Sequence, residues 1–139
     1  MELLFTAANL VPLPFWLLMI LLPHWRVTRR VMQSPWVVAP IAWLYVILVL
    51  PGMAGLIDLL AAPSLDTIAA ALSTPRGALM AWVHLLAFDL FAGRWAYLDS
   101  RERQVTAWLA SLALLFIYML GPLGLLLYLG LRVAYRRDG

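Results

Sequence analysis

Four long apolar stretches, separated by short polar segments, dominate the chain. They run from about residue 2 to 22, 36 to 60, 76 to 98 and 105 to 131. An α-helix needs about 20 apolar residues to cross the hydrocarbon of a bilayer, and each stretch has that length. The pattern predicts an all-α membrane protein, with four transmembrane helices in a single bundle over residues 1–139.

Proline and glycine interrupt three of these stretches, and in the second the weak points are Pro40 and Pro51-Gly52. Pro12 and Pro14 lie in the first, so we expect a kink or a late start of that helix. Gly121 and Pro122 lie in the fourth, where they predict either a kinked helix or a gap that lines a cavity.

A shorter amphipathic segment follows the second stretch, over about residues 64–74. Ser64 is a suitable N-cap residue, and the apolar residues after it share one helical face: Leu65, Ile68, Ala69 and Leu72. The segment is too short to span a bilayer. We therefore expect a helix that lies on the membrane surface.

Composition supports lipid as the solvent. The chain is 65% hydrophobic and 12% charged, whereas soluble domains are about 45–50% apolar and about 25% charged. It has no cysteine, which excludes disulfides and thiolate metal sites. The formal charge of +3 suits anionic lipid headgroups and is too small to indicate nucleic acid. The N-terminus lacks a basic region, so we expect the first stretch to remain uncleaved.

The arginines give a weak indication of orientation. Four spans would place the polar segments 23–35 and 99–104 on one side, with five arginines, and the termini on the other, with four. Because the first loop counts most, we predict cytoplasmic loops and external termini. That loop holds Arg26, Arg29 and Arg30, which form either a solvated loop or contacts to lipid headgroups or to a polar ring group of a substrate.

Three polar residues lie inside the third stretch: His84, Asp89 and Arg94. Successive helical residues turn by about 100°, so each lies about 140° from the next and no two share a face. An ionised Asp at the bilayer centre costs about 2.5–3.5 kcal/mol. Asp89 therefore needs water, a proton or a partner on another helix, for which the candidates are Asn9, Tyr45, Tyr118 and the loop arginines.

Two interpretations of this polar centre remain open. A structural clamp between helices is one, but interhelical hydrogen bonds average only about 0.6 kcal/mol, less than the insertion penalty. A functional site is the other. Metal binding fits poorly, because His24 and His84 are the two histidines of the chain. A single axial histidine on a porphyrin stays open.

Aromatic residues surround the polar centre. Phe88, Phe91 and Trp95 fall within about 40° of the direction of His84 and form a stripe. Most tryptophans lie near span ends, as expected of indoles at a membrane interface. Trp16 and Trp43 lie deeper, where they either pack in the core or line a pigment cleft.

A family resemblance rests on these residues. Its strongest part is Ala81-Trp82-Val83-His84-Leu85-Leu86, with Asp89-Leu90-Phe91-Ala92 and Arg94. Weaker matches extend it to most of the chain: Leu13-Pro14-Phe15, Leu18-Met19, Thr28-Arg29-Arg30, Met32, Ser34, Leu44-Tyr45, Tyr97, Asp99, Pro122 and Gly124. The sequence resembles the neoxanthin synthase-like (abscisic-acid-deficient-four) family of integral membrane proteins. The exclusive use of arginine as the basic residue indicates a bacterial member, in a cytoplasmic or photosynthetic membrane.

The resemblance implies a link to carotenoid metabolism. In plants the family is tied to the opening of an epoxide to an allene, which needs a base, an acid and no cofactor. Asp89 would be the base and His84 the acid, with Arg94 completing the polar centre. Because Asp89 and His84 are far apart in angle, the ligand would have to wrap around the helix. The implied substrate contacts are Phe88, Phe91, Trp95, Trp82, Trp16 and Tyr45.

Three functional hypotheses follow. The first is a small membrane protein that binds, and can isomerise, a carotenoid-like polyene without a cofactor. The alternative is a non-catalytic accessory subunit of a pigment–protein or other membrane complex. A transporter or proton relay built around Asp89 is the third. The expected partners are membrane lipids, a lipophilic polyene and a membrane complex, with no nucleic acid.

Overall fold

The structure is a computed structural model that describes residues 1–135, and no β-strand occurs in that part of the chain. In chain order the helices are α1 (Glu2–Leu10), α2 (Leu13–Leu21), α3 (Arg26–Gln33), η1 (Pro35–Val38), α4 (Ala39–Val49), η2 (Leu50–Gly52), α5 (Met53–Ala61), α6 (Leu65–Leu72), α7 (Pro75–Glu102), α8 (Ala107–Leu120) and α9 (Pro122–Ala134). The all-α prediction is confirmed.

Two helical paths within residues 1–135 are long and apolar enough to cross a membrane by length and composition: Glu2–Leu21 and Pro35–Ala61. The first path breaks between α1 and α2, where Pro12 and Pro14 stand. This confirms the predicted interruption, since proline removes a backbone donor and crowds the preceding turn. The second path contains two 3₁₀ turns, each of which has a proline.

The polar segment 23–35, expected as a loop, contains helix α3. Thr28 and Met32, one helical turn apart, are buried, and the Thr28 hydroxyl donates to the carbonyl oxygen of Leu22 at 2.9 Å. The arginines at positions 26, 29 and 30 face away from the buried Thr28 and Met32, which is an amphipathic helical pattern. The expectation of a loop is therefore wrong, because the polar composition of the segment outweighed its periodicity.

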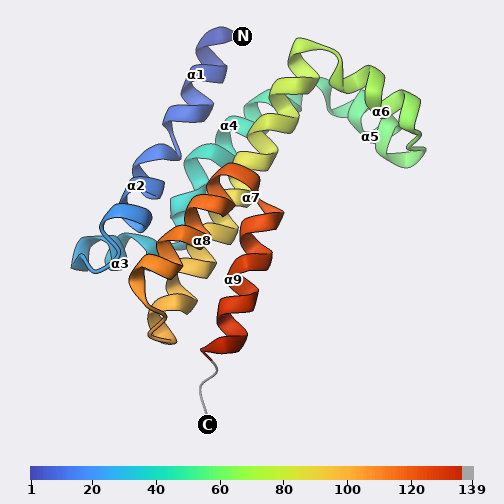
Figure 1. Ribbon diagram of the computed structural model, residues 1–139. Coiled ribbons are helices and arrows are strands. Elements are labelled where there is room, and N and C mark those ends of the chain that lie inside the picture. The colour runs from blue at the N-terminus through green and yellow to red at the C-terminus, as the bar shows by residue number, and fades with distance from the viewer. Residues whose placement is uncertain (136–139) are drawn as a thin grey trace.

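The expected amphipathic helix is confirmed as α6. Its N-cap, Ser64, accepts a hydrogen bond from the backbone N–H of Thr67, and the Thr67 hydroxyl oxygen accepts one from the backbone N–H of Ser64. Together α5 and α6 form an arm that projects from the bundle (Figure 1), and neither helix has a buried residue. Its position on a membrane surface stays a prediction.

Helix α7 is the axis of the bundle. Its 28 residues extend over about 42 Å at about 1.5 Å per residue, and it contacts α1, α2, α3, α4, α6, α8 and α9. Gly93 allows a close approach of α2, because the ring of the buried Trp16 occupies the space where a Cβ would stand.

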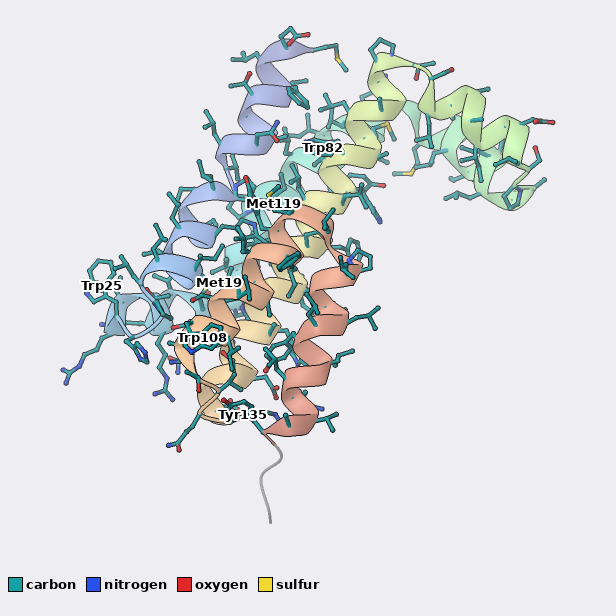
Figure 2. The ribbon with its side chains drawn as sticks, in the orientation of Figure 1. Met19, Trp25, Trp82, Trp108, Met119 and Tyr135 are labelled. Atoms are coloured by element: carbon teal, nitrogen blue, oxygen red, sulfur yellow. The ribbon has the colours of Figure 1, made fainter. Side chains whose placement is uncertain are left out.

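The fourth apolar stretch is not one continuous helix. Helices α8 and α9 run antiparallel as a hairpin (Figure 1), and the Thr106 and Tyr135 hydroxyls, at its open end, lie 2.8 Å apart. Figure 2 shows Met119 near the tip and Tyr135 at the far end of the hairpin. Gly121 makes the reversal with φ +40°, a conformation that residues with a Cβ rarely adopt.

The hairpin corrects one prediction. A single fourth helix over 105–131 is wrong, because the chain turns back at Gly121 rather than kinking there. Placement of both termini on one side of a membrane stays a prediction. The N-terminus and the end of α9 lie at opposite ends of the bundle (Figure 1).

Candidate functional site

A groove of about 440 Å³ runs between α7 and the α8–α9 hairpin, and we call it the α7/α9 groove. Its lining is apolar except for one carboxylate and consists of Phe88, Asp89, Phe91, Ala92, Trp95, Gly121, Pro122, Leu125 and Leu129. Phe88 and Phe91 are 61% and 55% exposed, so the groove opens sideways to the surroundings of the bundle. The predicted aromatic stripe therefore forms one wall of a real cavity.

Asp89 lies at the tip of the hairpin. A Cβ added to Gly121 would lie 2.6 Å from Asp89 Oδ1, so the carboxyl packs directly against the backbone of the turn. Within residues 1–135 no hydrogen bond or ion pair reaches this carboxyl. The hairpin thus presents it to the groove without compensating its charge.

None of the partners considered for Asp89, the loop arginines included, bonds its carboxyl within residues 1–135. The Asn9 side chain accepts from Trp82 Nε1 at 3.2 Å, and the Tyr118 ring packs against Trp16 with centroids 5.3 Å apart. Tyr45 lies beside His84, with ring centroids 5.5 Å apart. The neighbour of the Asp89 carboxyl on another helix is therefore the backbone of Gly121, which the sequence pattern did not predict.

His84 lies in a different cavity from Asp89. It lines a smaller space of about 180 Å³ enclosed by α4, α5, α6 and α7, together with Tyr45 and Met80. Phe88 connects the two places, because its ring lies 4.7 Å from the His84 ring and also lines the α7/α9 groove. The structure does not bring the predicted acid and base together, in agreement with their angular separation.

Arg94 is separate from both. Its Nε donates to the carbonyl oxygens of Met32 at 2.7 Å and Ser34 at 3.2 Å, and Nη2 donates to that of Gln33 at 3.0 Å. These carbonyls lie at the C-terminal end of α3, where helix carbonyls lack partners. Arg94 fastens α3 to α7 and does not line the groove, so its predicted place in one polar centre is not supported.

A polar cluster that the sequence pattern did not predict lies near the C-terminal end of α7, outside the groove lining. Asp99 Oδ2 accepts from Tyr128 Oη at 2.6 Å, Arg103 Nε at 2.9 Å and Arg132 Nε at 3.0 Å. Burial alone raises the pKa of the Asp99 carboxyl, but the hydrogen bonds outweigh it and hold that pKa below its ordinary value. The spacing of Asp99 and Arg103 was a detectable signal, whereas the partners on α9 were not.

Trp95 connects this cluster to the groove. The Arg132 guanidinium lies 5.7 Å from the centroid of the Trp95 ring, and the Trp95 ring meets that of Tyr128 edge-on at 5.5 Å. The groove therefore has an acid at the hairpin tip and an aromatic wall, and the charged cluster lies behind Trp95, outside the groove lining.

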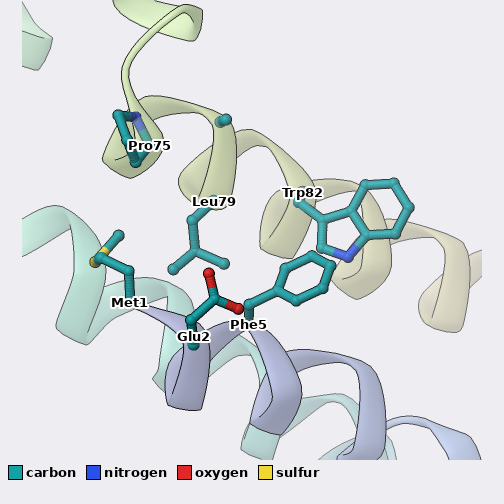
Figure 3. Close-up of a pocket in the computed structure, with 7 residues that line it drawn as sticks. Met1, Glu2, Phe5, Pro75, Leu79 and Trp82 are labelled. Atoms are coloured by element: carbon teal, nitrogen blue, oxygen red, sulfur yellow. The ribbon is translucent and has the colours of Figure 1, made fainter.

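The remaining predicted contacts lie outside this groove. Trp82 lines another cavity, of about 390 Å³, between α1 and the start of α7. Figure 3 shows the Glu2 carboxyl there, beside Phe5 and Leu79. Trp16 is buried in the core, which matches the packing interpretation. The exposed Arg26, Arg29 and Arg30 belong to α3.

The chemistry available in the groove is proton transfer. In the described residues no group of three or more His, Cys, Asp or Glu lies close enough to hold a metal ion. A carboxyl at the edge of an apolar space can accept a proton from a ligand and return it. The aromatic wall would stack on a flat apolar molecule.

Comparison with known proteins gives two matches. Residues 3–128 match the family described as ABA DEFICIENT 4-like. Over 119 residues, which are 81% of this chain, the sequence is 32% identical to Protein ABA DEFICIENT 4, chloroplastic, from Arabidopsis thaliana. The chain covers 54% of that relative, about half of its length. No solved structure matches the chain.

Proposed function

Because the chain belongs to the ABA DEFICIENT 4-like family, we propose that it is a membrane protein that binds a carotenoid-like polyene and isomerises it by proton transfer. The family resemblance supports the carotenoid-related function at a membrane. The site we assign is the α7/α9 groove, with Asp89 as the catalytic residue.

One observation carries the proposal: an unpaired carboxyl lies in an otherwise apolar, aromatic groove. A polyene is flat, rigid and apolar, which suits stacking against Phe88, Phe91 and Trp95. The lateral opening lets a lipophilic ligand enter from the membrane without passing through water. A charged side chain that lacks a structural partner in such a place favours a functional role.

A single carboxylate is sufficient for the chemistry. In epoxide-to-allene conversion a C–H bond breaks, the electron pair forms the new double bond, and the C–O bond of the epoxide opens to an alkoxide. Asp89 takes the proton from carbon and then returns it to the alkoxide oxygen, so the product is an isomer and no redox partner is needed. This removes the difficulty that His84 lies in another cavity.

His84 and Arg94 then act as positioning residues. His84 packs on Phe88 and so sets the angle of one wall ring of the groove. Arg94 holds α3 against α7 through three carbonyl oxygens. Neither needs to touch the reacting atoms.

Filling the groove tests the binding site. The protein is purified in detergent from a carotenoid-producing host, and the bound lipophile is identified by absorption and mass spectrometry. Ala92→Trp places an indole in the groove, whereas Ala42→Trp makes the same change on the exposed face of α4. Polyene should accompany the wild type and the Ala42 variant and be lost from the Ala92 variant. Equal polyene content in both variants would contradict the site.

A second candidate is a non-catalytic pigment-binding subunit. It is favoured because the groove offers no separate acid beside Asp89, which is the one ionisable residue among those that line it in residues 1–135. Incubation of the purified protein with xanthophyll epoxides, followed by chromatography of the isomers, separates the two functions. Bound polyene with an unchanged isomer composition would support the accessory function.

A further inference from the structure

Charge is divided unequally between the two ends of α7. The end where α7 begins holds Arg76 and three carboxylates, Glu2, Asp58 and Asp66, near the start of α1 and on the α5–α6 arm (Figure 1). The opposite end, which we call the basic end, holds seven of the arginines up to Tyr135 and two carboxylates, Asp99 and Glu102. The arginines are Arg26, Arg29, Arg30, Arg94, Arg101, Arg103 and Arg132.

The arginines of the basic end that have no partner in the described part of the chain lie on the outer face of helix α3. Thr28 and Met32 face the core, so Arg26, Arg29 and Arg30 are exposed, and no hydrogen bond or ion pair holds these three side chains within the described part of the chain. The other four arginines of the basic end bind carbonyl oxygens or Asp99. The three on α3 are therefore available to an external anion.

Exposed indoles flank the same helix. Trp25 and Trp36, which precede and follow α3, are 50% and 75% exposed, and Figure 2 shows Trp25 at the outer edge of the basic end. Tryptophan prefers the boundary between headgroups and hydrocarbon, and guanidinium groups bind phosphate oxygens well. Indoles and arginines together match the surface of an anionic lipid leaflet.

Because α8 and α9 form a hairpin, the end of α9 also lies at the basic end. Helix α8 has 14 residues and α9 has 13, about 21 Å and 20 Å, whereas the hydrocarbon layer is about 30 Å thick. Neither helix is long enough to cross alone. Arg132 binds Asp99 at the end of α7, so α9 ends where α8 begins.

We propose that α8–α9 is a re-entrant hairpin and that the basic end docks on an anionic lipid leaflet through α3. In this arrangement the chain crosses the membrane three times, the hairpin turns inside the bilayer near Asp89, and the end of α9 stays with the arginines on the cytoplasmic side. The start of α1 and the α5–α6 arm lie on the other side. This topology does not depend on the proposed polyene chemistry.

The natural absence of cysteine makes topology directly measurable. Single cysteines at three exposed positions, Ala62→Cys, Glu102→Cys and Ala134→Cys, are introduced into the full chain in a bacterial inner membrane. A membrane-impermeant maleimide is applied to intact cells and to inverted vesicles. The Ala62 variant should react in cells, and the other two should react in inverted vesicles.

Two outcomes would overturn the proposal. If the Ala134 variant reacts on the same side as the Ala62 variant while the Glu102 variant reacts on the other side, α8 and α9 together cross the membrane and the re-entrant hairpin is excluded. If the Glu102 and Ala134 variants both react in intact cells, the basic end faces the wrong leaflet.

Lipid composition tests the contact itself. The protein is reconstituted in bilayers of phosphatidylcholine with a minority of phosphatidylglycerol, extracted mildly, and its retained lipid measured by mass spectrometry. Replacement of Arg26, Arg29 and Arg30 by glutamine should lower phosphatidylglycerol enrichment about fivefold or more, because each basic residue adds attraction to an anionic surface. Replacement of the same three by lysine keeps the charge and should keep the enrichment. An unchanged enrichment in the glutamine variant would exclude α3 as the contact.

Discussion

Two aspartates on α7, ten residues apart, have opposite environments. Asp99 accepts three short hydrogen bonds, two of them from arginines, whereas Asp89 accepts none from residues 1–135 and packs against Gly121. A carboxylate with saturated partners contributes to stability. One without them contributes little to stability and stays available for chemistry. The comparison separates a structural acid from the acid that we propose to be functional on the same helix.

The largest effect is expected from Asp89→Asn. The amide cannot take up a proton, so turnover of the polyene should fall about 100-fold or more, whereas the unfolding temperature should stay equal or rise because an unpaired acid is lost. Isomer formation and thermal unfolding in detergent measure the two effects. Asp58→Asn, on the exposed α5, is the matched control. A large loss of stability in the Asp89 variant would mean that it is a second structural acid.

Asp99→Asn should show the opposite behaviour. It weakens three charge-assisted hydrogen bonds that join α7 to α9, so the free energy of unfolding should fall by about 2 kcal/mol. Detergent unfolding curves measure this loss, and Glu102→Gln at the exposed end of α7 should leave the curve unchanged. Equal curves for Asp99→Asn and the wild type would show that the cluster does not hold the hairpin.

Gly121→Ala tests the turn that presents Asp89. The added methyl group would meet Asp89 Oδ1 at 2.6 Å, and the backbone has φ +40°, so we expect a loss of about 1–2 kcal/mol in the free energy of unfolding. Gly130→Ala is the control, because no atom lies within 4 Å of its added Cβ and alanine favours a helix. If both variants unfold alike, the tip is not tightly packed.

The smallest effect concerns acid pH. Because the pKa of Asp99 lies below its ordinary value in the folded protein, its contribution to stability is complete above the ordinary value of about 3.9. It should be lost as the pH falls through the lower folded value. The stability difference between wild type and Asp99→Asn should therefore shrink below about pH 4, as measured by thermal unfolding. A difference that grows with acid would contradict the direction of the shift.

The sequence predicted the elements that depend on local pattern. Apolar stretches gave the long helices, Ser64 marked the start of α6, and Pro12 with Pro14 marked the break between α1 and α2. The aromatic stripe of Phe88, Phe91 and Trp95 follows from helical spacing alone, and it lines the groove. These features need no knowledge of distant residues.

Features that depend on distant contacts could not be predicted. The choice between a kink and a reversal at Gly121 is decided by φ +40° and by the close crossing at Gly124, where a Cβ would meet the backbone of Ile117. The sequence predicts one polar centre for Arg94 and Asp89, but the carbonyl partners of Arg94 are about 60 residues away along the chain, a separation that no local pattern reveals. The binding and catalytic roles of the groove residues stay predictions.

The α5–α6 arm has a practical consequence. Because neither helix buries a residue and α6 holds its own capping box, the link between them can change in length without disturbing the core. An epitope or a small fluorescent domain inserted after Ala62 should leave the bundle intact. The arm is therefore a natural attachment point for imaging or affinity capture of the protein.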